Sequence, residues 1–255
     1  MRRTSFGAAA IAALLTFAFA IPANANHSWN GYHWARTSNP FTLMLGDNVD
    51  STWDSYLRTT SSDWSQSTVL DTTVVAGQTK PRHCGATSGR VEVCNAKYGN
   101  NGWLGIASIW VTGGVHITQG TVKVNDTYFS TAQYNTSAWR NLVMCQEVGH
   151  TFGLDHQDTN FTNPNLGTCM DYTNDPSTNQ HPNQHDYDEL VTIYSHLDSF
   201  TTVGTSTAPV QGHAVGNAPR SWGKRVSGSA RHGVATYVRD FGGGSKVITQ
   251  VIWAA

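Results

Sequence analysis

Residues 145–158 of this 255-residue sequence carry the side chains with the clearest chemical potential. They read Cys-Gln-Glu-Val-Gly-His-Thr-Phe-Gly-Leu-Asp-His-Gln-Asp. On a helix, Gln146 and His150 lie one turn apart and face the same way. Gly153 can adopt the positive φ of a sharp turn, which allows the chain to bring His156 back to the same point. Three protein ligands with an open fourth position are typical of a catalytic zinc site.

Glu147 lies beside these three candidate ligands and suits a different role. A carboxylate next to a catalytic metal is the usual base for the metal's water. The pattern therefore predicts hydrolysis, with Gln146, His150 and His156 as metal ligands and Glu147 as the base. Gln146 is the weakest of the three ligands, because a neutral amide oxygen donates less charge to zinc than an imidazole nitrogen does.

This stretch resembles the metzincin signature H-E-x-x-H-x-x-G-x-x-H in its matrixin form. Glu147, His150, Gly153 and His156 match the signature, and Gln146 stands at the position of the first histidine. The resemblance implies a secreted Zn²⁺-dependent endopeptidase that cleaves extended peptide or protein substrates.

A second segment, Cys169-Met170-Asp171-Tyr172, resembles the Met-turn that lies under the zinc in this clan. Tyr172 follows the methionine by two residues, where astacins and serralysins carry a tyrosine that can contact the metal or the transition state. If Met170 lies under the zinc, its neighbour Cys169 must be close to Cys145 on the active-site helix, and we expect a disulfide between them. The resemblance also implies that the strand around Thr121 to Asn125 binds substrate by edge pairing.

The implied fold is an α+β metzincin-like catalytic domain, a twisted mixed sheet with an active-site helix and a C-terminal helix. We expect strands near 41–45, 68–75, 90–94, 103–111 and 116–129, and helices that begin near 50, 136 and 185. Residues 201–233 resemble a linker, and 234–239 with 246–253 predict a small β-hairpin extension. The expected divisions are thus 1–25, 26–200 and 201–255.

The start of the chain has the pattern of a secretory signal peptide. A short basic beginning precedes an apolar run from Gly7 to Ile21, and Ala23-Asn24-Ala25 has the form of a cleavage site. The net charge of −1 predicts no nucleic-acid or membrane partner, and we expect a monomer.

Four cysteines in a secreted chain are most simply interpreted as two disulfides. A single four-thiolate zinc site would need paired close spacings that are absent. The segment around Cys84 resembles the cysteine switch of matrixin pro-segments, but it has an extra residue and lies inside the domain. A Cys84–Cys94 disulfide is the better interpretation.

Several alternatives stay open. His116 is a candidate for the missing ligand, although a half-exposed strand histidine is commoner. Asp155, Asp158 and Asn160 are residues of the kind that binds Ca²⁺, although polar loop residues more often cap turns. The rival function is a non-catalytic metzincin-fold binding protein with an impaired zinc site, for which Gln146 is the main argument.

Overall fold

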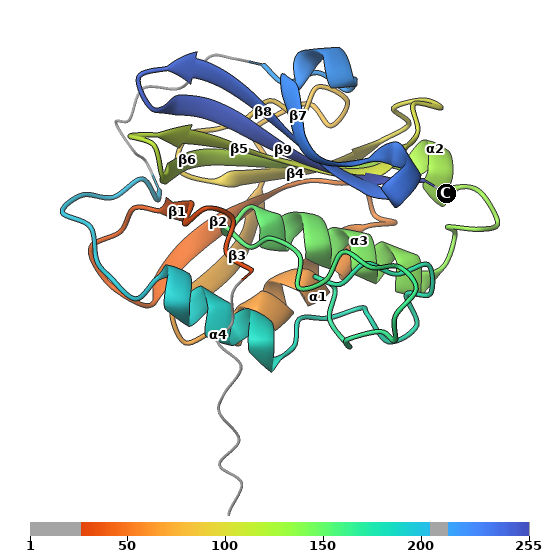
Figure 1. Ribbon diagram of the computed structural model, residues 1–255, viewed down its shortest axis with the longest axis horizontal. Helices are drawn as coiled ribbons and strands as arrows, with labels where there is room; N and C mark the ends of the chain where they lie inside the picture. The colour runs from red at the N-terminus through yellow and green to blue at the C-terminus, as the bar shows by residue number, and fades with distance from the viewer. Residues whose placement is uncertain (1–26, 205–213, 255) are drawn as a thin grey trace, which may run out of the picture.

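The computed structural model describes residues 27–204 and 214–254, and it has a mixed α/β architecture built on one large mixed sheet (Figure 1). The expected signal segment 1–25 lies outside the described residues. The strands are β1 (His33–Trp34), β2 (Phe41–Asn48), β3 (Leu70–Ala76), β4 (Val91–Ala96), β5 (Trp103–Thr112), β6 (His116–Asn125), β7 (Lys224–Ser229), β8 (Val234–Gly242) and β9 (Ser245–Trp253). The helices are α1 (Asp54–Trp64), α2 (Asp126–Phe129), α3 (Ser137–His150) and α4 (Gln184–Ile193), with short 3₁₀ turns η1 (Pro219–Ser221) and η2 (Ala230–His232).

The sheet has the strand order β3-β2-β4-β6-β5-β9-β8-β7, and β1 pairs with the first residues of β6. Strands β1, β2, β3, β4 and β6 run parallel to their neighbours in this group. Strand β5 is antiparallel to β6, and the C-terminal strands continue from β5 in antiparallel pairs. The C-terminal hairpin therefore extends the same sheet that carries the parallel strands.

Helices α1, α3 and α4 lie on one side of the sheet (Figure 1). Strands β5 and β6 are buried along almost their whole length, as expected for strands covered on both faces. The large core lies between the sheet and these helices and includes Trp34, Trp53, Trp64 and Val122. A second, smaller core joins Trp103 of β5 and Val251 of β9 to Trp222, so that the segment around η1 covers part of the sheet.

Several elements differ from the sequence-based expectation. Strand β6 ends at Asn125, whose side chain accepts a hydrogen bond from the Thr127 amide and starts the one-turn helix α2. Helix α1 begins at Asp54 rather than near 50, and the Asp50 carboxylate accepts from the Thr52 amide in the turn before the helix. Within the expected linker, residues 224–229 form strand β7.

The expected substrate-binding strand is an interior strand, which corrects that part of the prediction. Residues Thr121–Asn125 belong to β6, which pairs with β4 on one side and with β5 on the other. Their backbone groups are thus already hydrogen-bonded within the sheet. A strand in this position has no free edge to offer a peptide.

Over the described part of the chain, no helix has the length and apolar character needed to cross a membrane.

Candidate functional site

Helix α3 positions the first group of predicted site residues. The Thr136 side chain caps its N-terminus by accepting a hydrogen bond from the Trp139 amide. Near its C-terminus, Gln146, Glu147 and His150 are all buried. Gly149 lets the helix approach its surroundings closely, because a Cβ there would lie 2.6 Å from the Trp64 ring and 2.8 Å from Met170 Sδ.

The turn after α3 brings His156 back towards the helix. Gly153 has φ +96°, and a Cβ at this position would lie 1.9 Å from the Tyr32 carbonyl oxygen, so only glycine fits. The N-terminal segment fixes this turn from outside: the Trp29 amide donates to the Gly153 carbonyl at 2.8 Å. The turn predicted from Gly153 is therefore present. It requires glycine because its φ is positive and because a side chain would collide with the Tyr32 carbonyl.

The Nε2 atoms of His150 and His156 lie 3.1 Å apart, and we call these two residues the paired histidines. The Nδ1 atom of His150 lies 2.9 Å from the Leu154 carbonyl oxygen, and Nδ1 of His156 lies 3.1 Å from Asp155 Oδ1. Since a carbonyl and a carboxylate oxygen only accept, each Nδ1 carries the donated proton when its imidazole is neutral. Both Nε2 lone pairs then face one another.

Burial keeps these imidazoles neutral. Burial, with a smaller effect of the nearby His156 ring, lowers the pKa of His150 to about 3. Burial also lowers the pKa of His156, against the opposing effect of the Asp155 carboxylate. Two neutral imidazoles with facing lone pairs repel one another unless a cation lies between them. Tetrahedral zinc at its usual ~2.0–2.1 Å ligand distance would separate two nitrogens by about 3.3 Å, close to the observed spacing.

Gln146 and Met170 connect the helix to the predicted Met-turn. The Gln146 side-chain amide donates to the Cys169 carbonyl at 2.7 Å, and its Oε1 is buried with no hydrogen-bond partner. A Cys145–Cys169 disulfide links the same two segments, and a Cys84–Cys94 disulfide joins β4 to the preceding loop. Both pairings match the sequence-based expectation. The buried Met170 lies against Gly149, the residue immediately before His150.

Glu147 follows Gln146 on α3, and Tyr172 packs against His156. The Glu147 carboxylate accepts a hydrogen bond from the backbone of Ala107 on β5, and its Oε2 is buried without a partner. Burial raises the pKa of Glu147 well above its ordinary value. The Tyr172 ring packs edge-on against His156 with centroids 4.1 Å apart, and burial also raises the pKa of its phenol.

The C-terminal hairpin reaches this site from the far side of β5. Gln250 of β9 donates to Asp155 Oδ1 at 3.2 Å, so the carboxylate that holds His156 is itself held by β9. Close to η2, a Cβ on Gly233 would lie 2.3 Å from the Phe161 ring, and Phe161 stacks on Tyr172. The residues after position 201 thus take part in the surroundings of the paired histidines, which the sequence did not indicate.

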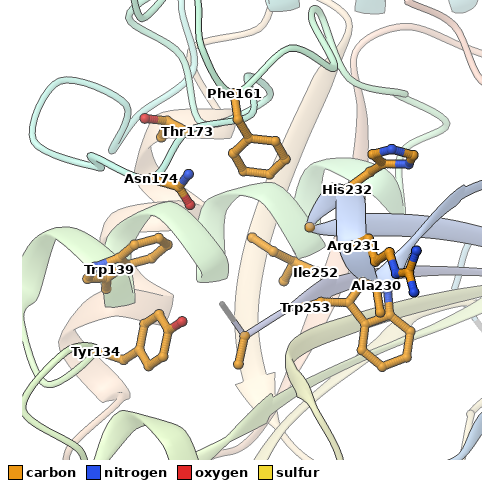
Figure 2. A pocket seen from close by; sticks show the side chains of 12 residues that line it. Tyr134, Trp139, Phe161, Thr173, Asn174, Ala230, Arg231, His232, Ile252 and Trp253 are labelled. Atoms are coloured by element: carbon orange, nitrogen blue, oxygen red, sulfur yellow. The ribbon is translucent and has the colours of Figure 1, made fainter.

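A cavity of about 200 Å³ opens beside this aromatic contact (Figure 2). Trp139 of α3 and Phe161 line one side of it, and Ile252 of β9 lines the other. The guanidinium of Arg231 and the ring of His232 come from η2 at its rim. Phe161 lines the cavity and stacks on Tyr172, which in turn packs against His156, so these two rings lie between the cavity and His156.

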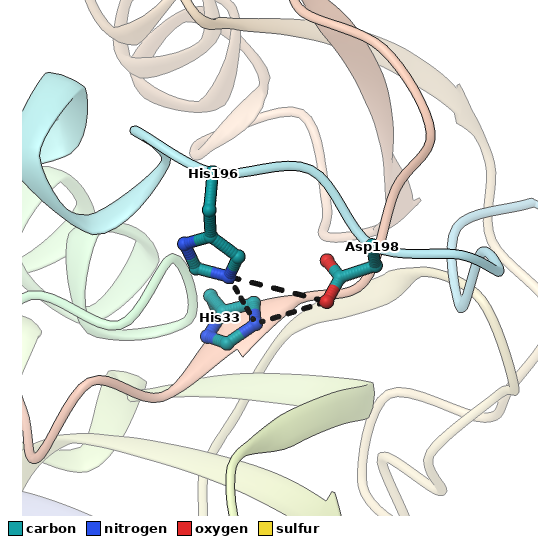
Figure 3. A group of neighbouring side chains, drawn as sticks. All are labelled: His33, His196 and Asp198. Atoms are coloured by element: carbon teal, nitrogen blue, oxygen red, sulfur yellow. Dashed lines mark hydrogen bonds and ion pairs between the residues drawn. The ribbon is translucent and has the colours of Figure 1, made fainter.

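His116 does not join the paired histidines. It belongs to a second cluster with His33, His196 and Asp198, in which the His33–His196–Asp198 group is able to hold a metal ion (Figure 3). Of these three, His33 is buried and His196 is exposed. The ligand atoms of His33, His196 and Asp198 all lie within 4.8 Å of one another. The sequence did not indicate these three residues, because His33 lies more than 160 positions before His196 and Asp198 and no local motif joins them.

The candidate calcium residues act as turn caps in the structure. Asp158 Oδ1 accepts from the Asn160 amide, and Asn160 Oδ1 accepts from the Thr162 amide at 3.0 Å. Asp155 Oδ1 is occupied by His156 and Gln250. Calcium binding by these residues stays a prediction.

No protein-family model matches the sequence, and a search of the curated proteins finds no match. The case for a function therefore rests on the residues and their geometry.

Proposed function

We propose that this chain is a secreted zinc-dependent endopeptidase of the metzincin type. The observation that carries the proposal is the convergence of His150 Nε2 and His156 Nε2 at 3.1 Å, with both Nδ1 atoms engaged by acceptors. This arrangement presents two lone pairs to one point, as a metal requires. The two disulfides are consistent with export to an oxidising compartment.

The other residues at the site fit zinc as well. Gln146 Oε1 is a buried oxygen without a partner, and it comes from the helical position one turn before His150. An unpaired buried acceptor is costly unless a ligand satisfies it. We therefore assign His150, His156 and Gln146 as the residues that would hold the ion. When bound, zinc would supply a Lewis acid and lower the pKa of a water molecule.

Glu147 is the group that would move protons. Its Oε2 has no hydrogen-bond partner, so this oxygen is free to take a proton from water. Burial favours the protonated carboxyl, and the acid so formed can deliver the same proton to the leaving amine of a cleaved peptide bond. The Ala107 backbone hydrogen bond orients the carboxyl throughout.

Tyr172 and the neighbouring cavity would serve the substrate. The Tyr172 phenol has a pKa raised by burial, so it stays protonated and is able to donate to a developing oxyanion. The cavity next to it is lined by the rings of Trp139 and Phe161, which suit an apolar side chain of an extended peptide.

The alternative is a non-catalytic binding protein, and one observation favours it. Strand β9 pairs along β5 from Trp103 to Val111, so the sheet edge closest to Glu147 is already occupied. A substrate would have to bind without pairing to β5, or with β9 displaced. In the binding-protein case the zinc site is impaired by Gln146, and no peptide is cut.

The test is a comparison of the mature protein with Glu147→Gln. We expect the parent to contain zinc and to cleave a denatured protein substrate in a chelator-sensitive manner. Glu147→Gln should keep its zinc but lose at least about 100-fold in rate, as is usual when a general base is removed. Glu189→Gln, a second buried glutamate on α4, is the matched control and should retain the parental rate.

Equal activity of the parent and Glu147→Gln would refute the catalytic proposal. A parent that binds zinc and cleaves nothing would support the binding protein instead. A parent that binds no zinc through His150 and His156 would refute the zinc peptidase and would fit the binding protein with an impaired zinc site.

A further inference from the structure

We propose that His33, His116, His196 and Asp198 form a second metal site, a four-ligand centre for zinc, which we call the distal centre. It does not depend on the proposed peptidase activity. Figure 3 shows three of its side chains, from β1 and from the segment after α4, pointing towards one another. The fourth, His116, is the first residue of β6.

Strand pairing sets up one half of the distal centre. In the parallel pair of β1 with β6, His33 lies directly opposite His116. Side chains at paired positions of adjacent strands leave the same face of the sheet, and the two imidazole centroids are 5.0 Å apart. The backbone register therefore brings two histidines together whose positions differ by more than 80 residues.

The segment after α4 supplies the other half. The Asp198 amide donates to the Arg36 carbonyl, and the Thr202 amide donates to the Ala35 carbonyl, each at 2.9 Å. These bonds attach residues 198–202 alongside the residues that follow β1. His196 and Asp198 are thereby held over His33.

The ligand atoms of His33, His196 and Asp198 lie within 4.8 Å of one another, and His116 Nε2 lies outside this group but next to Asp198. Asp198 Oδ1 lies 3.2 Å from His116 Nε2, 3.7 Å from His33 Nε2 and 3.9 Å from His196 Nε2. His33 Nε2 and His196 Nε2 are 3.2 Å apart. Tetrahedral zinc would place its ligand atoms about 3.3 Å from one another, so the atoms of His33, His196 and Asp198 fit with small adjustments. The His116 ring would have to move towards His33 and His196 to become the fourth ligand.

Neighbouring groups leave the ligand atoms free for a cation. His33 Nδ1 donates to the Gly31 carbonyl at 2.7 Å, which leaves its Nε2 with a lone pair. Asp198 uses its other oxygen, Oδ2, to accept from the Arg36 guanidinium at 3.0 Å and from the Arg36 amide. One carboxylate oxygen is thus fixed by arginine, and the other faces three imidazoles.

The ligand set indicates both the metal and its role. Three imidazoles and a carboxylate suit zinc better than calcium or magnesium, which prefer oxygen ligands. Four protein ligands fill the usual coordination of zinc and leave no position for a substrate. The distal centre is therefore structural: it ties β1, β6 and the segment after α4 together.

The experiment measures zinc per chain in the full mature protein after dialysis against zinc. His196→Ala and His116→Ala are the test variants, and His196 is half exposed, so its removal should leave the fold intact. His181→Ala is the matched control, because His181 is another exposed histidine that is paired with a carboxylate, Asp63. We expect each test variant to lose one zinc equivalent and the control to lose none.

A second measurement keeps the result independent of activity and of the paired histidines. Zinc should raise the melting temperature of the parent and of His181→Ala, and the part of this rise due to the distal centre should vanish in His196→Ala. Unchanged zinc content and an unchanged melting shift in His196→Ala would overturn the proposal and leave the cluster as a hydrogen-bonded network. Loss of zinc in His196→Ala but not in His116→Ala would overturn the assignment of His116.

Discussion

The two histidine clusters of this protein are built in opposite ways. At the paired histidines, Gln146, His150 and His156 come from eleven consecutive residues at the end of α3 and in the turn that follows it. At the distal centre, the four side chains come from β1, the start of β6 and the segment after α4, and strand register brings them together. One site is encoded locally, and the other exists only once the sheet has formed.

The clusters also differ in what their ligands can do. The paired histidines have one weak ligand, an adjacent buried carboxylate with an unpaired oxygen, and an aromatic cavity nearby. The distal centre has four strong ligands. Its only carboxylate, Asp198, is also paired with Arg36, so it has no unpaired oxygen like that of Glu147. An incomplete ligand set beside a proton acceptor favours catalysis, whereas a complete set favours stability. This contrast leads to three predictions.

The largest effect should come from the disulfide that joins α3 to Met170. Replacing Cys145 and Cys169 by alanine opens a loop of 24 residues, and the chain-entropy model gives a loss of about 3.5 kcal/mol in the free energy of unfolding. Removing the Cys84–Cys94 pair, with a separation of 10 residues, should cost about 2.8 kcal/mol. Urea unfolding of both double variants measures these losses.

The two disulfide variants should differ more in zinc affinity than in the free energy of unfolding. Loss of Cys145–Cys169 should weaken zinc at the paired histidines, because Gln146 is anchored to the Cys169 carbonyl. Loss of Cys84–Cys94 should leave that affinity unchanged, and neither variant should alter the distal centre. Equal zinc affinities in both variants would contradict the proposed coupling between the disulfide and the site.

The second prediction concerns the weak ligand itself. Gln146→His should tighten zinc binding at the paired histidines by about 10-fold, which is 1.4 kcal/mol, because imidazole is a better zinc ligand than an amide oxygen. Competition with a chromophoric chelator measures the affinity. Gln146→Ala is the control and should bind more weakly than the parent. An unchanged affinity in both variants would mean that position 146 is not a ligand.

The contrast between the clusters also explains which features could be predicted from sequence. The approximate positions of the strands and of α3 and the turn at Gly153 could be predicted, because helical spacing and a glycine turn act over a few residues. The Cys145–Cys169 disulfide was expected from the resemblance of residues 169–172 to a Met-turn, and Cys84–Cys94 from the even number of cysteines. The distal centre could not be predicted, because no local pattern shows that His33 pairs with His116. The same limit applies to β6, whose alternating pattern gave no sign of its interior position.

The C-terminal strands show the limit from another direction. The hairpin has a recognisable pattern, but its own sequence does not indicate which other strand of the sheet it pairs with. Only the structure shows that β9 joins β5 and that Gln250 contacts Asp155. Residues 224–229 were expected to be part of a linker because their polar, glycine-containing sequence is atypical of a buried strand, and β7 is indeed an exposed edge strand.

The smallest effect should come from Gln250, which connects β9 to the paired histidines. Its amide donates to Asp155 Oδ1, and the same oxygen lies 3.1 Å from His156 Nδ1. Replacing the carboxylate partner of a metal ligand typically costs 10–100-fold in affinity, and Gln250 is one step further from the metal. We therefore expect Gln250→Leu to weaken zinc binding at the paired histidines by about 3-fold and to leave the distal centre unchanged.

The matched control for Gln250→Leu is Thr249→Val, on the same strand. The Thr249 hydroxyl bonds to Ser108 on β5, away from Asp155, so this variant also removes a buried side-chain hydrogen bond between strands. Each variant should lose about 1 kcal/mol in the free energy of unfolding. If both change zinc affinity equally, the effect comes from general loosening of the sheet. If only Gln250→Leu changes it, β9 positions His156 through Asp155, and the C-terminal hairpin is part of the site at which the locally encoded motif binds its metal.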